Sequence, residues 1–180
     1  MITIEIHKNS ITNVHTDAIV NAANSGLRQG GGVCGYIFKA AGEAALAQEC
    51  NAIGHCDEGS AVITSGCGLK EKNGNKYIIH AVGPRYSDGR HGEPERLRGC
   101  YRRSLELAVE NGCRSITFPL ISAGIFGYPV REAWTVALSS CREFIGEHPD
   151  AELKIVFVGL DRDVLEVGKE ILQDLEVRKS

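Results

Sequence analysis

A glycine-rich connection between an apolar segment and a helical one constrains this chain more than any other feature. Residues 21–35 read Asn-Ala-Ala-Asn-Ser-Gly-Leu-Arg-Gln-Gly-Gly-Gly-Val-Cys-Gly, between an apolar run over 18–20 and a helical pattern over 36–41. Consecutive glycines let backbone N–H groups approach a ligand without interference from Cβ atoms. A helix N-terminus adds free N–H donors and partial positive charge. The sequence therefore predicts a strand-to-helix turn that binds a phosphate or another anion, with Asn21 and Asn24 as amides for neighbouring hydroxyl groups.

Two better-known glycine loops fit this segment less well. A P-loop needs a Lys-Ser or Lys-Thr pair after its glycines, whereas Lys39 lies further along the chain. Gly30, Gly32 and Gly35 match the spacing of a dinucleotide-binding loop. That single match carries little weight because the chain contains 21 glycines. The alternative without a ligand is a tight connection between a strand and a helix.

Length, charge and cysteine usage bound the function. A chain of 180 residues is within the range of one domain, which we expect over residues 1–180. The net charge of −3 argues against bulk electrostatic binding to nucleic acid or an anionic membrane. We expect no membrane span, because no run of about eighteen apolar residues occurs, and no signal peptide. The sequence predicts no cofactor.

Seven cysteines lie scattered along the chain without a C-x-x-C pair. This pattern indicates reduced thiols, mostly as small core residues, and a cytoplasmic location. A zinc site built from Cys50, His55 and Cys56, with Cys67 following, is the less favoured alternative, because paired short spacings are absent. The sequence therefore predicts no metal.

Apolar segments alternate with helical patterns, which favours an α/β sandwich with a mixed, mostly parallel sheet. Predicted strands cover residues 3–7, 17–21, 60–65, 77–82, 115–120 and 153–158. Predicted helices cover residues 33–50, 94–111, 129–147 and 161–176. We expect the first strand at a sheet edge and the charged segment 85–98 to be a solvated loop and helix start. His80 and Trp134 are expected to be core residues.

A second glycine-containing loop, residues 122–129, also follows a predicted strand and precedes a helix N-terminus. Ligands of parallel sheets bind at the carboxyl ends of the strands, so both loops qualify as anion cradles. Phe126 lies between Gly124 and Gly127, where an aromatic ring could cover a ribose or a base. The alternative is that Phe126 packs into the core. Two cradles at one edge favour a diphosphate ligand, or a nucleotide with two phosphate groups.

With these motifs in register, the chain resembles a macrodomain over nearly its full length. The matching segments are Asn21-Ala22-Ala23-Asn24, the glycine run, Ala40-Ala41-Gly42, His80-Ala81-Val82-Gly83-Pro84 and Ser122 to Gly127. The resemblance implies a three-layer α/β/α fold that binds ADP-ribose or an ADP-ribosylated protein, with Asn24 on the distal ribose and Phe126 beside it. The residues implied to hold the diphosphate are Gly30, Gly31, Gly32, Val33, Gly35, Ser122, Ala123, Gly124, Ile125 and Phe126.

Three positions depart from the family pattern. Ser10, followed by Ile11, stands where many members carry an Asp that receives the adenine amino group. A serine accepts hydrogen bonds but has no charge, so this contact would be weaker. Leu160 stands where an aromatic residue often flanks the adenine, and leucine offers area without stacking. Cys34 replaces the Asp of the Gly-Val-Asp-Gly loop, which is thought to position or activate the attacking water in the MacroD-type hydrolases.

Three functions are compatible with this resemblance. The first is an enzyme that removes ADP-ribose from acidic side chains or deacetylates O-acetyl-ADP-ribose. In it, the ligand's own phosphate holds the water while Asn24 and the loop amides position it. The others are a non-catalytic reader of ADP-ribose marks and a phosphatase acting on ADP-ribose 1″-phosphate. Some viral-type macrodomains resemble this chain in lacking the Asp, and members of that type still hydrolyse ADP-ribosyl esters. We therefore favour the hydrolase, with Asn24 as its catalytic residue and Cys34 as a second candidate.

Overall fold

The computed structural model describes residues 1–178 and has a six-stranded sheet at its centre. The strand order is β1-β6-β5-β2-β4-β3, and all neighbours are parallel except β3 and β4. The strands are β1 (Ile2–Lys8), β2 (Ala18–Ala22), β3 (Ala61–Ser65), β4 (Tyr77–Ala81), β5 (Ser115–Phe118) and β6 (Leu153–Gly159). This order confirms the predicted mixed, mostly parallel sheet with the first strand at an edge.

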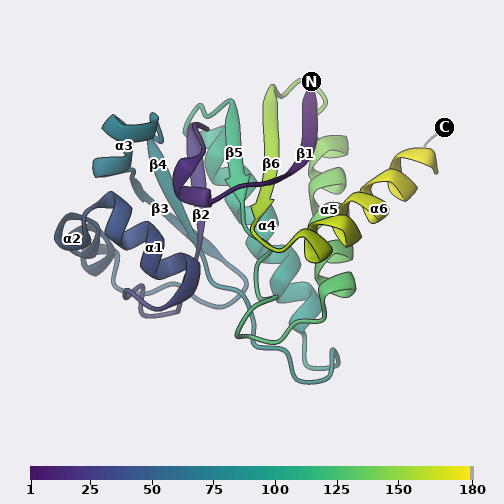
Figure 1. Cartoon of the computed structure of the whole chain (residues 1–180), viewed down its shortest axis with the longest axis horizontal. Helices are drawn as coiled ribbons and strands as arrows, with labels where there is room; N and C mark the ends of the chain where they lie inside the picture. Colours follow the sequence, from purple (N-terminus) through teal and green to yellow (C-terminus); the bar gives the residue numbers. More distant parts are fainter. Residues whose placement is uncertain (179–180) are drawn as a thin grey trace.

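Helices cover both faces of the sheet, which gives the three layers of an α/β/α sandwich. Figure 1 shows α1 and α2 on one side of the sheet and α5 and α6 on the other. The helices are α1 (Gly32–Ala41), α2 (Glu43–Ile53), α3 (Gly68–Asn73), α4 (Glu93–Glu110), α5 (Val130–Glu147), α6 (Arg162–Val177) and a 3₁₀ turn, η1 (Ile11–Asn13). Within residues 1–178, none of these helices combines the length and hydrophobicity needed to cross a membrane.

The helix predicted over residues 33–50 is wrong, because the chain breaks it into α1 and α2 at Gly42. This residue has φ +101°, a left-handed conformation that glycine adopts without a steric penalty. Its N–H group donates to the carbonyl of Phe38 and ends α1, and α2 starts at the next residue. The alanines on both sides favour helix, so the interruption depends on this one glycine.

The contact between α5 and α6 fixes the end of α6 that faces the site. Trp134 of α5 is 1% exposed, which confirms its prediction as a core residue. Its indole N–H donates to the carbonyl of Val164 at 2.8 Å. A Cβ on Gly168 would lie 2.5 Å from the indole ring, so the glycine lets the two helices approach closely. The first turn of α6 is therefore held against the core.

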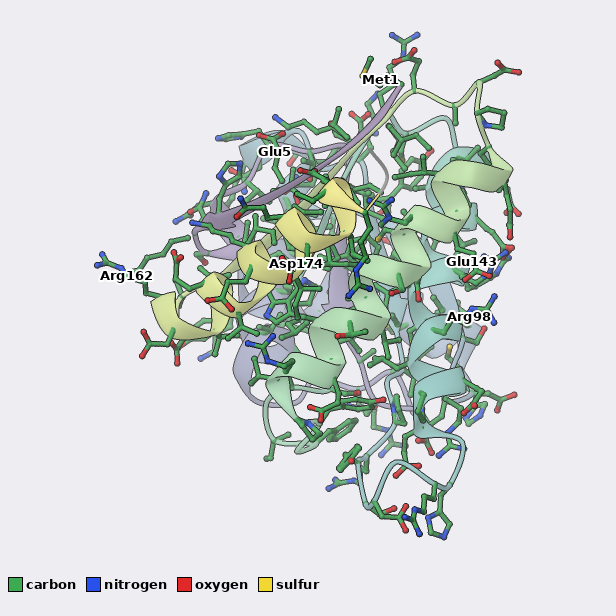
Figure 2. All side chains as sticks on the ribbon, turned by 90° about the vertical axis from the view of Figure 1, so that its right-hand side faces the viewer. Met1, Glu5, Arg98, Glu143, Arg162 and Asp174 are labelled. Atoms are coloured by element: carbon green, nitrogen blue, oxygen red, sulfur yellow. The ribbon has the colours of Figure 1, made fainter. Side chains whose placement is uncertain are left out.

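Ion pairs on the outer surface join α4 to α5. Figure 2 shows Arg98 of α4 and Glu143 of α5 pointing toward each other. The guanidinium of Arg102 lies 2.6 Å from a carboxylate oxygen of Glu147 and 3.9 Å from a carboxylate oxygen of Glu143. Exposed pairs of this kind contribute at most about 1 kcal/mol each. The buried apolar contacts between the layers, rather than these charges, hold the fold together.

The seven cysteines carry free thiols, and six of them are buried. Burial raises the pKa of Cys50 to about 11 and that of Cys100 to about 12. Both thiols are therefore neutral and unreactive near pH 7. This confirms that most of the cysteines are small core residues, while a cytoplasmic location stays a prediction.

Candidate functional site

A cavity of about 580 Å³ opens where the parallel strands end. Its walls come from the segments that follow β2, β4, β5 and β6, as expected for a ligand site in a parallel sheet. A cavity of this size is typical of a nucleotide-sized ligand. The predicted site residues that line it are Gly31, Gly32, Val33, Cys34, Ser122, Gly124, Ile125, Phe126 and Leu160.

The first glycine loop ends on the first residue of α1. No atom lies within 4 Å of a Cβ built on Gly31 or Gly32, so the protein leaves the space beside their backbone open. Gly35 has a different role, because a Cβ there would lie 2.8 Å from the carbonyl oxygen of Gly30. Neither Gly30 nor Gly35 lines the cavity, and the missing side chain of Gly35 lets the Gly30 carbonyl pack against the first turn of α1.

Asn24 organises the same loop through its side-chain amide. Its Oδ1 accepts the N–H of Arg28 at 3.0 Å, and its Nδ2 donates to the Arg28 carbonyl at 2.7 Å. The side chain does not line the cavity, although the preceding residue, Ala23, does. One hydrogen on Nδ2 and one lone pair on Oδ1 remain for a ligand. A catalytic role for Asn24 stays a prediction.

Cys34 lines the cavity and rests on Asn21. The thiol residue is 5% exposed, and its Sγ lies 3.6 Å from Asn21 Nδ2 and 3.7 Å from the Arg28 carbonyl. Asn21 is 1% exposed and absent from the cavity wall. The Asn21 amide therefore bonds inside the protein, and its expected contact with ligand hydroxyls stays a prediction. Asn21 lies on a central strand covered on both faces, where a polar side chain bonds inside the protein.

The Asn21 amide continues into a buried polar chain. Its Nδ2 lies 3.1 Å from Nδ1 of His80, whose Nε2 lies 3.0 Å from the Thr64 hydroxyl. The Thr64 hydroxyl donates to the Ser65 carbonyl at 3.0 Å, so it accepts the proton of His80 Nε2. Burial lowers the pKa of His80 to about 4 and keeps the ring neutral near pH 7. This confirms His80 as a hydrogen-bonded core histidine.

The second glycine loop is a tight turn closed by its own backbone. Tyr128 N–H donates to the Ser122 carbonyl at 2.9 Å, and Gly127 N–H donates to the Gly124 carbonyl at 3.0 Å. Ser122 has φ +67° and is 7% exposed as a residue, and its buried hydroxyl has no partner among the described residues. A Cβ on Gly83 would overlap that hydroxyl, so glycine lets the segment after β4 reach the loop.

Phe126 lines the cavity and is half-buried rather than packed into the core. The guanidinium of Arg85 lies 4.7 Å from the centre of its ring. The N–H of Tyr86 donates to the Phe126 carbonyl at 2.9 Å. Ile125, the residue before Phe126, is 92% exposed at the cavity wall. The ring is therefore available to a ligand, while the connection after β4 supports its outer face. Ala123, the remaining predicted residue of this loop, does not line the cavity.

The start of α6 forms the opposite end of the cavity. Leu160 is 67% exposed there, and Asp161 follows it on the cavity wall. The Asp161 Oδ1 accepts the N–H groups of Asp163 at 2.9 Å and Val164 at 3.3 Å, which caps α6. The Asp161 carboxylate therefore both caps α6 and forms part of the cavity wall.

Ser10 and Ile11 do not line this cavity. Ile11 is 6% exposed in the core, and the Ser10 hydroxyl lies 3.0 Å from that of Thr12. Sequence reasoning also missed Asp161 and Trp134, which both contribute to the wall. The position of Asp161 two residues after the last strand was a usable signal, whereas that of Trp134 within a helix was not.

Comparison with known proteins identifies the family. A family model described as Macro domain matches residues 20–137. A macro domain-containing protein of Chlorobaculum tepidum is 45% identical over 163 residues, which cover 91% of this chain and 92% of that protein. The ADP-ribose glycohydrolase MACROD1 of Mus musculus is 44% identical over 162 residues, 89% of this chain and 49% of that protein. The Oceanobacillus iheyensis macrodomain, solved with ADP, has a TM-score of 0.89 at 35% identity and covers 97% of this chain and 92% of its own. The chain therefore belongs to the macrodomain family.

Proposed function

We propose that this protein binds ADP-ribose in the cavity and hydrolyses ADP-ribosyl esters. The substrates would be mono-ADP-ribosylated acidic side chains or O-acetyl-ADP-ribose. The observation that carries the proposal is the meeting of two glycine loops in one cavity of about 580 Å³. Bare backbone at Gly31 and Gly32, directly at the start of α1, suits a diphosphate. The name of the mouse relative and the ADP bound to the Oceanobacillus iheyensis structure support the same ligand class.

The two ends of the cavity suit the two ends of ADP-ribose. Phe126 and the loop held by Asn24 would face the distal ribose, and the start of α6 would face the adenine. Leu160 and Val164 offer apolar area to a base without stacking it. With Ser10 in place of a carboxylate, the adenine amino group lacks a charged acceptor at that position. The proposal therefore assigns more of the affinity to the diphosphate and the distal ribose.

Ester hydrolysis at the distal ribose makes small chemical demands on the protein. With O-acetyl-ADP-ribose, water adds to the acetyl carbonyl carbon, the bond from that carbon to the ribose oxygen breaks, and the ribose oxygen takes a proton from the water. With a mono-ADP-ribosylated acidic side chain, water adds to C1″ of the ribose while the bond from C1″ to the carboxylate oxygen breaks. The carboxylate leaves as an anion and needs no proton, and the proton of the water passes to a ligand phosphate oxygen. The protein then has to position the ribose and stabilise charge. Asn24 and the loop amides can perform both tasks without an acidic side chain at Cys34.

A reader module without turnover is the second candidate. Two observations favour it: both polar atoms of the Asn24 amide already bond the Arg28 backbone, and a thiol occupies the position of the hydrolase Asp. In that case the cavity would bind ADP-ribose as the end state. The phosphatase alternative uses the same cavity with ADP-ribose 1″-phosphate as the substrate.

Titration and single-turnover kinetics test these proposals. We expect calorimetry to show ADP-ribose binding more tightly than ADP, and a mono-ADP-ribosylated glutamate peptide to release ADP-ribose in one turnover. Asn24→Ala should reduce the rate more than the affinity, because orientation counts most in the transition state. Failure to bind ADP-ribose would remove the proposal altogether. Binding without release would favour the reader, and release of phosphate from ADP-ribose 1″-phosphate would favour the phosphatase.

A further inference from the structure

The connection between β4 and α4, residues 85–92, lies against the second glycine loop from outside the cavity. Tyr86 N–H donates to the Phe126 carbonyl at 2.9 Å, and the Arg85 guanidinium covers the Phe126 ring at 4.7 Å. The ring centroids of Tyr86 and Tyr128 are 4.8 Å apart. Neither Arg85 nor Tyr86 lines the cavity. The position of Phe126 therefore depends on a segment that does not itself face the ligand.

A single buried carboxylate holds this connection. Glu93 opens α4 and is 0% exposed, although it lies in a segment expected to be solvated. Its Oε2 accepts the N–H groups of Ser87 at 3.0 Å, Asp88 at 3.2 Å and Gly89 at 3.0 Å, and also the Ser87 hydroxyl at 3.0 Å. Its Oε1 accepts the N–H of His91 at 2.6 Å. These bonds, that from the Ser87 backbone foremost, hold the pKa of Glu93 well below its usual range.

The same residues offer a metal site as the alternative interpretation. Ligand atoms of Asp88, His91 and Glu93 lie within 4.8 Å of one another. However, four N–H groups and one O–H group already occupy the Glu93 carboxylate, and His91 Nδ1 lies 2.8 Å from Asp88 Oδ1. A cation would have to displace these donors. The arrangement fits a carboxylate that binds the backbone N–H groups of a loop better than one that binds a metal ion.

We propose that Glu93 is a positioning residue of the ADP-ribose site, acting on Phe126 through the connection formed by residues 85–92. This inference rests on the proposed function. Without the carboxylate charge, the converging N–H groups lose their shared acceptor and the segment loosens. Phe126 then loses the fixed partners of its carbonyl and its ring. The effect should fall on the distal ribose, which ADP-ribose has and ADP lacks.

Glu93→Gln tests the inference with little change in side-chain size. The new amide adds N–H donors to a cluster of donors and removes the charge. We expect ADP-ribose affinity to fall about tenfold, the scale of one lost charge-assisted hydrogen bond, and ADP affinity to fall about twofold or less. Hydrogen exchange of the Tyr86 amide should accelerate, because its bond to the Phe126 carbonyl opens more often. Ser87→Ala removes one hydroxyl donor and should shift both readouts less in the same direction, which provides a test if Glu93→Gln fails to fold.

Glu95→Gln is the matched control. Glu95 lies in the same first turn of α4, is exposed, and has no hydrogen bond or ion pair in the described part of the chain. The Glu95→Gln substitution removes the same charge as Glu93→Gln and should leave the affinities for ADP-ribose and ADP unchanged. If wild-type protein binds ADP-ribose while Glu93→Gln and Ser87→Ala keep its preference for ADP-ribose over ADP, the inference is wrong and the proposed function stands. Stabilisation of wild type by Zn²⁺ that Glu93→Gln abolishes would also overturn it, in favour of a metal site.

Discussion

Mild acid should destabilise this protein through one buried histidine. His80 is 0% exposed, and burial lowers its pKa to about 4 in the folded protein, whereas an ordinary histidine titrates near 6.5. Because the folded-state pKa is the lower one, the unfolded chain binds the proton first. The contribution of the neutral ring is therefore complete above about pH 6.5 and is lost as the pH falls toward about 4.

The size of this effect follows from the distance between the two pKa values. At about 1.4 kcal/mol for each pH unit, the free energy of unfolding should fall by about 3 kcal/mol across the window. That is a large share of the about 5–15 kcal/mol that a typical domain has in total. The chain from Thr64 through His80 to Asn21 adds to this cost, because a protonated ring would donate at Nδ1, where the Asn21 amide donates in the structure.

Urea denaturation of wild type and His80→Gln measures the effect. The substitution carries a cost of its own, but that cost is the same at every pH. Between about pH 6.5 and pH 4.5, the free energy of unfolding should fall more steeply in wild type than in His80→Gln, by about 1 kcal/mol per pH unit. Carboxylates such as Glu93 titrate at lower pH and contribute equally to both proteins. Parallel stability curves would refute the reasoning and show that the folded protein accommodates a charged His80.

Substitutions at four further positions test the first glycine loop and the adenine contact. Cys34→Ala should keep most of any hydrolysis and Cys34→Asp should raise it in single-turnover assays; a loss above about a hundredfold in Cys34→Ala with binding intact would make the thiol catalytic. Ser10→Asp should tighten ADP-ribose binding by about 1 kcal/mol in calorimetry, and unchanged affinity would mean that adenine is held elsewhere. Gly35→Ala forces a Cβ to 2.8 Å from the Gly30 carbonyl and should lower the free energy of unfolding by about 1–3 kcal/mol in urea denaturation, whereas Gly31→Ala, with open space around it, should not.

The parts of the site that sequence predicts are those set by the local chain. Gly31 and Gly32 lie directly between a buried strand and a helix, and this order alone places bare backbone at a helix start. The second loop is predicted in the same way, from a strand, two glycines and a helix. Gly42 shows the limit of local reasoning within one helix. Its position among alanines favours helix by propensity, yet its left-handed backbone ends one helix and begins another.

The parts that sequence misses depend on contacts between distant segments. Asn21 and Asn24 are the same residue type three positions apart, and only the pairing of β2 between β4 and β5 decides that Asn21 is buried against His80. Glu93 lies in a segment rich in charge and is nevertheless buried by the turn it gathers around itself. The pattern of apolar residues along the chain does not predict the burial of Asn21 or of Glu93, because each depends on where another segment packs.

The departures from the family pattern share one property: they change side chains and leave the backbone cradles intact. Ser10, Cys34 and Leu160 differ in charge or shape from the residues common at those positions. The open backbone at Gly31 and Gly32 contributes N–H groups that no side-chain change at those three positions removes. Recognition of the diphosphate should therefore be the constant part of the chemistry, and selectivity for the base and activation of water the variable parts. For the same reason, a residue that holds a loop backbone in place from outside the cavity, as proposed for Glu93, should matter more to binding than its distance from the ligand suggests.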